Sequence, residues 1–168
     1  RLCFGDYTEA QLKETVDKVL NDLDLYEIKD FQVGDPLNKM ISGGQRKRLN
    51  IGLELMREPV VLFVDEPTSG LSSFDSEKVM TLLRYQALQG KLVFAIIHQP
   101  SSDIIKMFDK LWILDKGGYM IYDGDPVEAL VYFKTETSQA NAAESECPSC
   151  GNVETDNILH IIEVKVID

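Results

Sequence analysis

The sequence has few cysteines and no long apolar run. Three cysteines in 168 residues are too few for the disulfide framework of a small secreted domain, so we expect a protein of the reducing cytosol. No stretch approaches the roughly 18 consecutive apolar residues that a transmembrane helix needs. The chain begins at Arg1 without a signal peptide or other targeting segment. We therefore expect it to be a piece of a longer protein.

Positive charge is also scarce. The chain has 17 Lys and Arg against 28 Asp and Glu, and its formal net charge is −11. A general nucleic-acid-binding protein needs a basic face, so we expect no nucleic-acid partner. The excess of acids is greatest near the end, where residues 135–168 hold seven acids and one base, Lys165. This shift in composition predicts a separate acidic tail.

Two capping boxes predict the starts of helices in the first third of the chain. Thr8 is followed by Gln11, and Ser42 by Gln45, so that a hydroxyl and an amide each satisfy a free backbone N–H. Apolar residues then recur at helical spacing, and the second helix is expected to end before Pro59. No strand is predicted up to that point.

Strands and helices alternate after Pro59. Two continuous apolar runs, 60–64 and 92–97, are typical of strands that are buried on both faces. A helix over 75–89 separates them, and a hairpin and a helix follow within 111–133. Strand–helix–strand alternation with short loops predicts an α/β domain with a largely parallel sheet.

Two adjacent acids, Asp65 and Glu66, follow the first apolar run in VVLFVDEP. They stand at the carboxyl end of the predicted strand, which is where open α/β sheets bind their ligands. One acid there can hold Mg²⁺ through its water shell, and its neighbour can orient or deprotonate an attacking water. The alternative is a pair of acids that only caps the strand end.

The segment ISGGQ places Ser42, Gly43 and Gly44 before Gln45 at the N-terminus of the second predicted helix. Glycines allow close backbone approach, and the free N–H groups and the helix dipole favour an anion. The basic residues 46–48 add positive charge behind this terminus. The pattern predicts a phosphate site, and the alternative is an ordinary helix cap followed by a solvated basic turn.

His98 ends the second apolar run, in LVFAIIHQPSS. A lone histidine at a strand end is more often a packing residue than a functional one. The order of the segments favours function, however, because SGGQ, the run with Asp-Glu-Pro, Thr-Ser-Gly-Leu and the run with His follow one another at short intervals. A chance match of all four segments in that order is improbable.

With these segments the sequence resembles the ATP-binding cassette (ABC) ATPases up to about residue 134. ISGGQ is similar to the family signature, VVLFVDEP to the Walker B strand, TSGLSS to the D-loop and His98 to the switch histidine. The segments IHQPSSDIIKMFDKL and YDGDPVEALVYF are most similar to the white-type transporters of the G subfamily. The resemblance implies a partial P-loop NTPase fold. Its parts would be a helical subdomain over 1–59, the C-terminal half of the mostly parallel ATPase core over 60–134, and the acidic tail over 135–168.

The resemblance also implies a catalytic site. Asp65 would hold Mg²⁺ through water, Glu66 would polarise the hydrolytic water, and His98 would contact the γ-phosphate of ATP. The protein would couple ATP hydrolysis to transport at the cytoplasmic face of the membrane, together with a transmembrane domain. The alternatives are a non-transport ABC ATPase and a module that binds a partner through its tail.

The signature residues would act on a second subunit. By the resemblance, Ser42 and Gly44 would contact the γ-phosphate of a nucleotide held by a second ATP-binding domain in a head-to-tail dimer. Gly43 and Gln45 belong to the same loop and would help to bind that nucleotide.

Two features depart from the family pattern. The D-loop normally ends in Asp, whereas Ser72 stands at that position here and the next acid, Asp75, lies three residues further on. The phosphate-binding loop, G-x-x-x-x-G-K followed by Ser or Thr, is missing, because the one Gly-Lys pair is Gly90-Lys91 and Tyr85 stands five positions before that glycine. We therefore expect the chain to hold half of an ATPase site and to be inactive alone.

The acidic tail contains a C-x-x-C pair, Cys147 and Cys150, followed by Gly151. Two thiolates and a tight glycine turn supply half of a tetrahedral zinc site, which two chains, or His160 with a further ligand, can complete. Cys3 is far away in the sequence. Free thiols and a redox pair are the alternatives to zinc.

Overall fold

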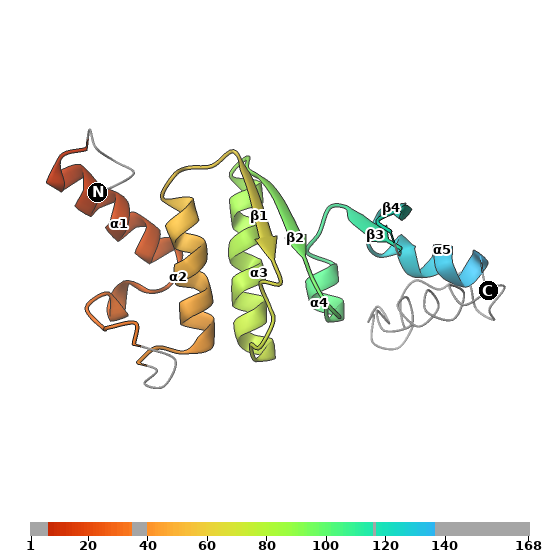
Figure 1. The fold of residues 1–168 in the computed structure, drawn as a ribbon, viewed down its shortest axis with the longest axis horizontal. Helices are drawn as coiled ribbons and strands as arrows, with labels where there is room; N and C mark the ends of the chain where they lie inside the picture. The colour runs from red at the N-terminus through yellow and green to blue at the C-terminus, as the bar shows by residue number, and fades with distance from the viewer. Residues whose placement is uncertain (1–6, 35–39, 116, 137–168) are drawn as a thin grey trace. The chain divides into compact units, whose positions relative to one another are not determined.

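The computed structural model describes residues 7–34, 40–115 and 117–136 (Figure 1). The chain divides into two compact units, Arg1–Ile97 and His98–Asp168. Each unit has its own regular elements, and the predicted site residues other than His98 and the tail cysteines belong to the first unit.

The first unit begins with helices that start where the capping boxes predict. α1 spans Glu9–Asp22 and α2 spans Gly43–Leu55, with the short 3-10 helix η1 at Tyr26–Ile28 between them. Thr8 and Ser42 are the N-cap residues, and both boxes are complete, with a side-chain bond in each direction. The prediction of two capped helices before Pro59 is therefore confirmed. The sequence did not predict η1.

A β–α–β unit follows. β1 spans Val61–Asp65, α3 spans Ser73–Leu88 and β2 spans Leu92–Ile96, and Figure 1 shows the two strands side by side next to α3. The strands pair in parallel, with Val61 opposite Leu92 and Asp65 opposite Ile96. This arrangement confirms the predicted α/β class. α3 begins ahead of the predicted position because Ser72, rather than a later residue, is its N-cap.

The core of the first unit is formed by α2, the inner side of the β–α–β unit and the segment that joins α1 to α2, while α1 itself has no buried residue. Its buried apolar side chains include Leu23, Leu25, Ile41, Ile51, Leu55, Leu62, Val79, Met80, Leu82 and Leu83. The residues of α3 in this set face both α2 and the strands, so α3 is the element on which the rest of the unit packs.

The prediction that both strands are buried on both faces is wrong for the described chain. Leu62 of β1 is buried, but its neighbours Val61 and Phe63 are exposed, Phe63 by 76%. The reason is that α3 packs on one face of this two-stranded sheet, and within the described residues no element covers the other face. On the open face Phe63 stacks on Phe94, with ring centroids 4.9 Å apart.

The second unit contains the predicted hairpin and last helix. β3, Leu111–Leu114, pairs antiparallel with β4, Met120–Gly124, and α5 covers Glu128–Glu136. The turn between the strands uses Gly117 and Gly118, whose φ angles of 87° and 81° favour glycine. The unit also contains a helix that the sequence did not predict, α4, at Ser102–Ile105.

The hairpin and α5 share a small core. Ala129 and Phe133 of α5 are buried against apolar side chains of both strands, namely Leu111, Ile113, Ile121 and Tyr122. The apolar residues that the sequence places at helical spacing in α5 therefore serve to anchor this helix on the hairpin.

We expect the open face of the β1–β2 sheet to make the 168-residue chain associate with itself, because the exposed Phe63 ring, stacked on the half-buried Phe94, forms an apolar patch. Phe63→Ser should lower the average mass measured by sedimentation equilibrium. Phe74→Ser is a matched control, since Phe74 lies on α3 and is 67% exposed, and it should leave the mass unchanged. Equal masses for the two variants would contradict the expectation.

Candidate functional site

The two predicted acids lie where β1 ends. Asp65 is the last residue of the strand and pairs with Ile96. The backbone N–H of Glu66 donates to the Ile96 carbonyl at 2.9 Å, so the ladder continues for one residue beyond the strand. Both acids are exposed, while Pro67 behind them is buried. The carboxylates are therefore presented to solvent at the carboxyl end of a parallel pair.

The backbone of Glu66 is in an unusual conformation. Its φ of 43° lies in the left-handed region, which is disfavoured for a residue with a side chain. The residue is fixed by its bond to β2 and by a turn in which the Ser69 N–H donates to the Glu66 carbonyl at 3.2 Å. Strained residues that are held in this way cluster at functional sites. Asp24, Glu58 and Gln99 have left-handed backbones as well, so the argument for a role of Glu66 depends on its place beside Asp65 at the end of β1 together with this conformation.

The signature segment forms the first turn of α2. The Ser42 hydroxyl accepts from the Gln45 N–H at 3.1 Å, and the Gln45 side-chain oxygen accepts from the Ser42 N–H at 2.8 Å. Because the hydroxyl is an acceptor in this box, its hydrogen is available for another partner. The N–H groups of Gly43 and Gly44 belong to the first turn, where no intrahelical carbonyl is available. The terminus thus offers hydroxyl and backbone donors to an anion.

The glycines of the signature are packed against the segment that follows the acids. A Cβ added at Gly43 would lie 3.5 Å from the Leu71 side chain. A Cβ at Gly44 would lie 2.9 Å from the Cβ of Asp75 and closer still to its carboxyl group. The sequence predicts glycine here for close backbone approach, and the structure shows that an acidic side chain of α3 occupies the space at Gly44.

Arg48, one turn behind the signature, connects three elements. Its Nε donates to the Leu23 carbonyl at the end of α1, at 3.0 Å. Its Nη1 lies 3.8 Å from Asp75 Oδ1 in the first turn of α3, and the arginine side chain is only 6% exposed. A solvated basic turn therefore does not describe Arg48. Sequence reasoning missed this contact, because the interacting residues are far apart along the chain.

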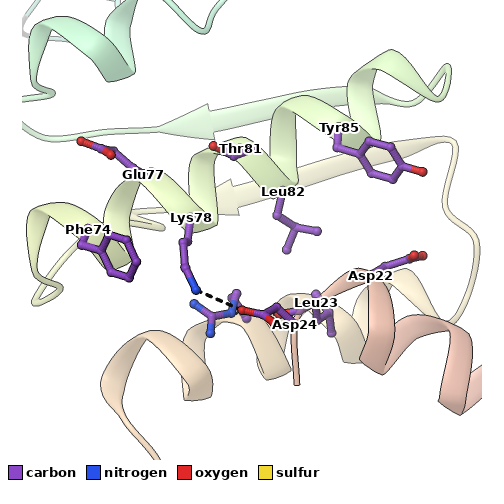
Figure 2. A pocket seen from close by; sticks show the side chains of 10 residues that line it. Asp22, Leu23, Asp24, Phe74, Glu77, Lys78, Thr81, Leu82 and Tyr85 are labelled. Carbon is purple, nitrogen blue, oxygen red and sulfur yellow. Dashed lines mark hydrogen bonds and ion pairs between the residues drawn. The ribbon is translucent and has the colours of Figure 1, made fainter. Parts of the chain in front are cut away.

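A second ion pair joins α3 to the end of α1. Figure 2 shows Lys78 reaching from α3 to Asp24, with 3.0 Å between Lys78 Nζ and Asp24 Oδ2. The hydrogen bond from Lys78, and then its positive charge, hold the pKa of Asp24 below its ordinary value of 3.8. The pair spans a pocket of about 500 Å³, and none of the residues predicted to contact nucleotide lines this pocket.

His98 opens the second unit and is exposed. It follows the end of β2 and precedes Gln99, whose φ of 48° is again left-handed. In the same loop Ser101 caps α4, with its hydroxyl accepting from the Ile104 N–H at 3.4 Å. His98 is therefore displayed on a sharply turned segment, and its functional role stays a prediction.

The predicted zinc ligands Cys147 and Cys150 lie outside the described residues. Within residues 7–34, 40–115 and 117–136, no three or more His, Cys, Asp and Glu side chains form a group that could hold a metal ion. None of the described helices is long and apolar enough to cross a membrane.

The fold and site define the class of ABC-type ATP-binding cassettes. The class is indicated by a parallel β–α–β unit with an acid pair at its strand end, packed beside a helix that starts with Ser-Gly-Gly-Gln. A solved structure of cbiO1 from Clostridium perfringens, described as part of the ABC transporter complex cbiONQ, has a TM-score of 0.65 and 29% sequence identity. The match covers 79% of this chain and 50% of that chain.

Sequence comparisons agree with this class. The family model described as ABC transporter matches residues 5–69. ABC transporter G family member 28 of Arabidopsis thaliana is 43% identical over 131 residues, or 78% of this chain and 12% of that protein. The uncharacterized ABC transporter ATP-binding protein/permease YOL075C of Saccharomyces cerevisiae is 37% identical over 159 residues, or 94% of this chain and 12% of that protein.

The chain belongs to the ABC transporter family, and its relatives include members of the G family. It spans about an eighth of the length of these two relatives, 12% in each case. The resemblance to the G subfamily that the sequence alone indicated is confirmed.

The Asp24–Lys78 ion pair makes the free energy of unfolding depend on pH. The pKa of Asp24 is lowered in the folded state from its ordinary value of 3.8. The pair therefore stabilises the folded state fully at pH values above 3.8, and this contribution is lost as the pH falls through the pKa that Asp24 has in the folded state. An exposed pair contributes less than about 1 kcal/mol. Lys78→Met should therefore lower the melting temperature more at pH 6 than at pH 3, as measured by circular dichroism. Lys18→Met, at an exposed lysine of α1, should lack this difference, and equal losses at both pH values for Lys78→Met would contradict it.

Proposed function

We propose that this chain supplies half of an ATP hydrolysis site in an ABC transporter and that the whole protein couples ATP hydrolysis to membrane transport. The observation that carries the proposal is the presence, in one compact unit, of a glycine-rich helix terminus capped by Ser42 and a strand end bearing two exposed acids. The relatives are named as transporters, and one is named as an ATP-binding protein/permease, which favours transport over a non-transport ATPase.

The two acids would have different roles. Glu66 would orient the attacking water and accept its proton, since its strained backbone turns it out of the strand end. Asp65 would hold Mg²⁺ through the water shell of the ion, which suits an exposed carboxylate oxygen. When bound, Mg²⁺ neutralises charge on the β- and γ-phosphates. His98 would donate a hydrogen bond to the γ-phosphate from its exposed loop.

The signature terminus would serve the neighbouring subunit. Ser42, Gly43 and Gly44 would donate to the γ-phosphate of an ATP held by a second ATP-binding domain in a head-to-tail dimer. Gln45 would act indirectly, because its side-chain oxygen is held in the capping box and keeps Ser42 in place. One chain would then contribute acids to one nucleotide and the signature to another.

The proposed organisation of the chain has three parts. Residues 1–59 would be the helical subdomain, 60–134 the second half of the ATPase core and 135–168 an acidic tail. The ATPase would work at the cytoplasmic face of the membrane with a transmembrane domain, which would select the transported substrate. Zinc is not part of the proposal, because no described group of side chains supports it.

Glu66→Gln should lower ATP turnover of the full transporter by about 10²–10⁴-fold, the usual loss when a general base is removed. ATP binding should be unchanged, because this carboxylate orients water and does not hold the nucleotide. Glu58→Gln is a matched control: Glu58 is another exposed glutamate with a left-handed backbone, at a φ of 49°. Wild-type turnover of Glu66→Gln in a steady-state assay would rule out Glu66 as the base.

The 168-residue chain alone should not hydrolyse ATP. Affinity for the β- and γ-phosphates comes mainly from the N–H groups and the lysine of a phosphate-binding loop, which this sequence does not contain. Calorimetry with Mg-ATP and a coupled ATPase assay on the purified chain test this. Micromolar affinity combined with turnover above the buffer blank would contradict the prediction.

A further inference from the structure

Asp75, which has no role in the proposed function, contacts both the cap of α3 and the signature helix α2. The Ser72 hydroxyl donates to Asp75 Oδ2 at 3.1 Å and accepts from the Asp75 N–H at 3.1 Å, which closes the first turn of α3. The other carboxylate oxygen, Oδ1, faces the buried guanidinium of Arg48 in α2 at 3.8 Å. One carboxylate therefore joins the cap of α3 to the signature helix.

The same side chain fits against the signature backbone. Gly44 has no room for a Cβ because the Asp75 side chain fills that space, and Leu71 lies beside Gly43 in the same way. Asp75 is largely shielded, with 28% of its side chain exposed. The first turn of α2 cannot shift along α3 unless Asp75 also moves.

A short hydrogen-bonded loop extends this connection to the acid pair. The Ser69 N–H donates to the Glu66 carbonyl and the Leu71 N–H to the Thr68 carbonyl, both at 3.2 Å. These two turns restrain the backbone between the strained Glu66 and the cap at Ser72. The first turn of α3 thus contacts the signature terminus directly and is connected to Glu66 by this short loop.

Charge balance supports the same role. An unpaired carboxylate beside the N-terminus of α2 would repel an anion bound there. The guanidinium of Arg48 lies 3.8 Å from Asp75 Oδ1, the oxygen that also lies beside Gly44, and its positive charge compensates that of the carboxylate in a buried position. Asp75 can therefore support the terminus mechanically without opposing the binding of phosphate.

We propose that Asp75 is a positioning residue, which with Arg48 fixes the signature terminus relative to the loop that begins at Glu66. This inference rests on the proposed function, because it assigns Asp75 to the control of geometry between the acid pair, which would serve one nucleotide, and the signature terminus, which would serve the other. It also gives a function to the acid that stands three residues after Ser72, where the family pattern has its aspartate at Ser72 itself.

The test uses steady-state ATPase kinetics of the full transporter. Asp75→Asn keeps the size of the side chain and its bond to Ser72 but removes the charge that faces Arg48. We expect kcat to fall about 10-fold, since misplaced reacting groups lose rate steeply, while KM for ATP stays within about twofold. Where Asp75→Asn does not fold, Asp75→Ser should show the same loss, because the Ser72 hydroxyl can still cap α3 by accepting from the backbone N–H of residue 75.

Lys78→Met is the matched control, because it breaks a different ion pair of α3, the one with Asp24 at the end of α1, one turn further along α3. It should lower the melting temperature and leave kcat within about twofold. The variant with both Arg48→Met and Asp75→Asn should be no slower than Arg48→Met alone, as expected for one coupled pair.

The outcomes separate the two levels of the hypothesis. A wild-type transporter without ATP turnover would overturn the proposed function and this inference with it. An active wild type in which Asp75→Asn and Lys78→Met have the same kcat would overturn the role of Asp75 alone. A loss confined to Asp75→Asn, at equal melting temperatures of the two variants, would establish it.

Discussion

The hydrogen bond from Arg48 Nε to the Leu23 carbonyl, 3.0 Å long, ties the signature helix to the end of α1. A buried guanidinium is costly unless its N–H groups and its charge are compensated. Leu23 supplies a carbonyl and Asp75 a negative charge, although Nη1 finds no hydrogen-bond partner within the described residues. The compensation of Arg48 therefore requires α2 to stay beside the end of α1 and the start of α3, and the contacts of Gly43 with Leu71 and of Gly44 with Asp75 depend on that arrangement.

The signature terminus combines two demands that conflict in most helices. For the proposed role, it would have to leave N–H groups open to an anion and be packed tightly enough to have one position. The capping box of Ser42 and Gln45 rigidifies the turn through side chains, so that the glycine N–H groups remain open. Packing comes from the side of the helix, where the missing Cβ atoms admit Leu71 and Asp75.

Features set by neighbours in sequence could be predicted, and features set by distant contacts could not. The capping boxes depend on residues three apart, and the parallel strands on continuous apolar runs, so both were readable from the sequence. The short helices η1 and α4 have too few residues for a periodic pattern. The contact of Gly44 with Asp75 joins segments on two helices, and no local pattern encodes it. The open strand face was missed because an apolar run does not specify how many layers cover it.

Glu66 illustrates why a strained residue can be maintained at such a site. A left-handed residue with a side chain costs on the order of 1–3 kcal/mol, and the loop itself gains little by packing because its residues are largely exposed. The conformation is maintained from both sides, by the bond to Ile96 in β2 and by the turns that lead to the cap of α3. Because α3 packs on both β2 and α2, the cap at which these turns end is itself fixed by its neighbours in the unit. In the proposed role of Glu66, a carboxylate placed in this way would need no rearrangement when its substrate arrives, which is the condition for efficient positioning.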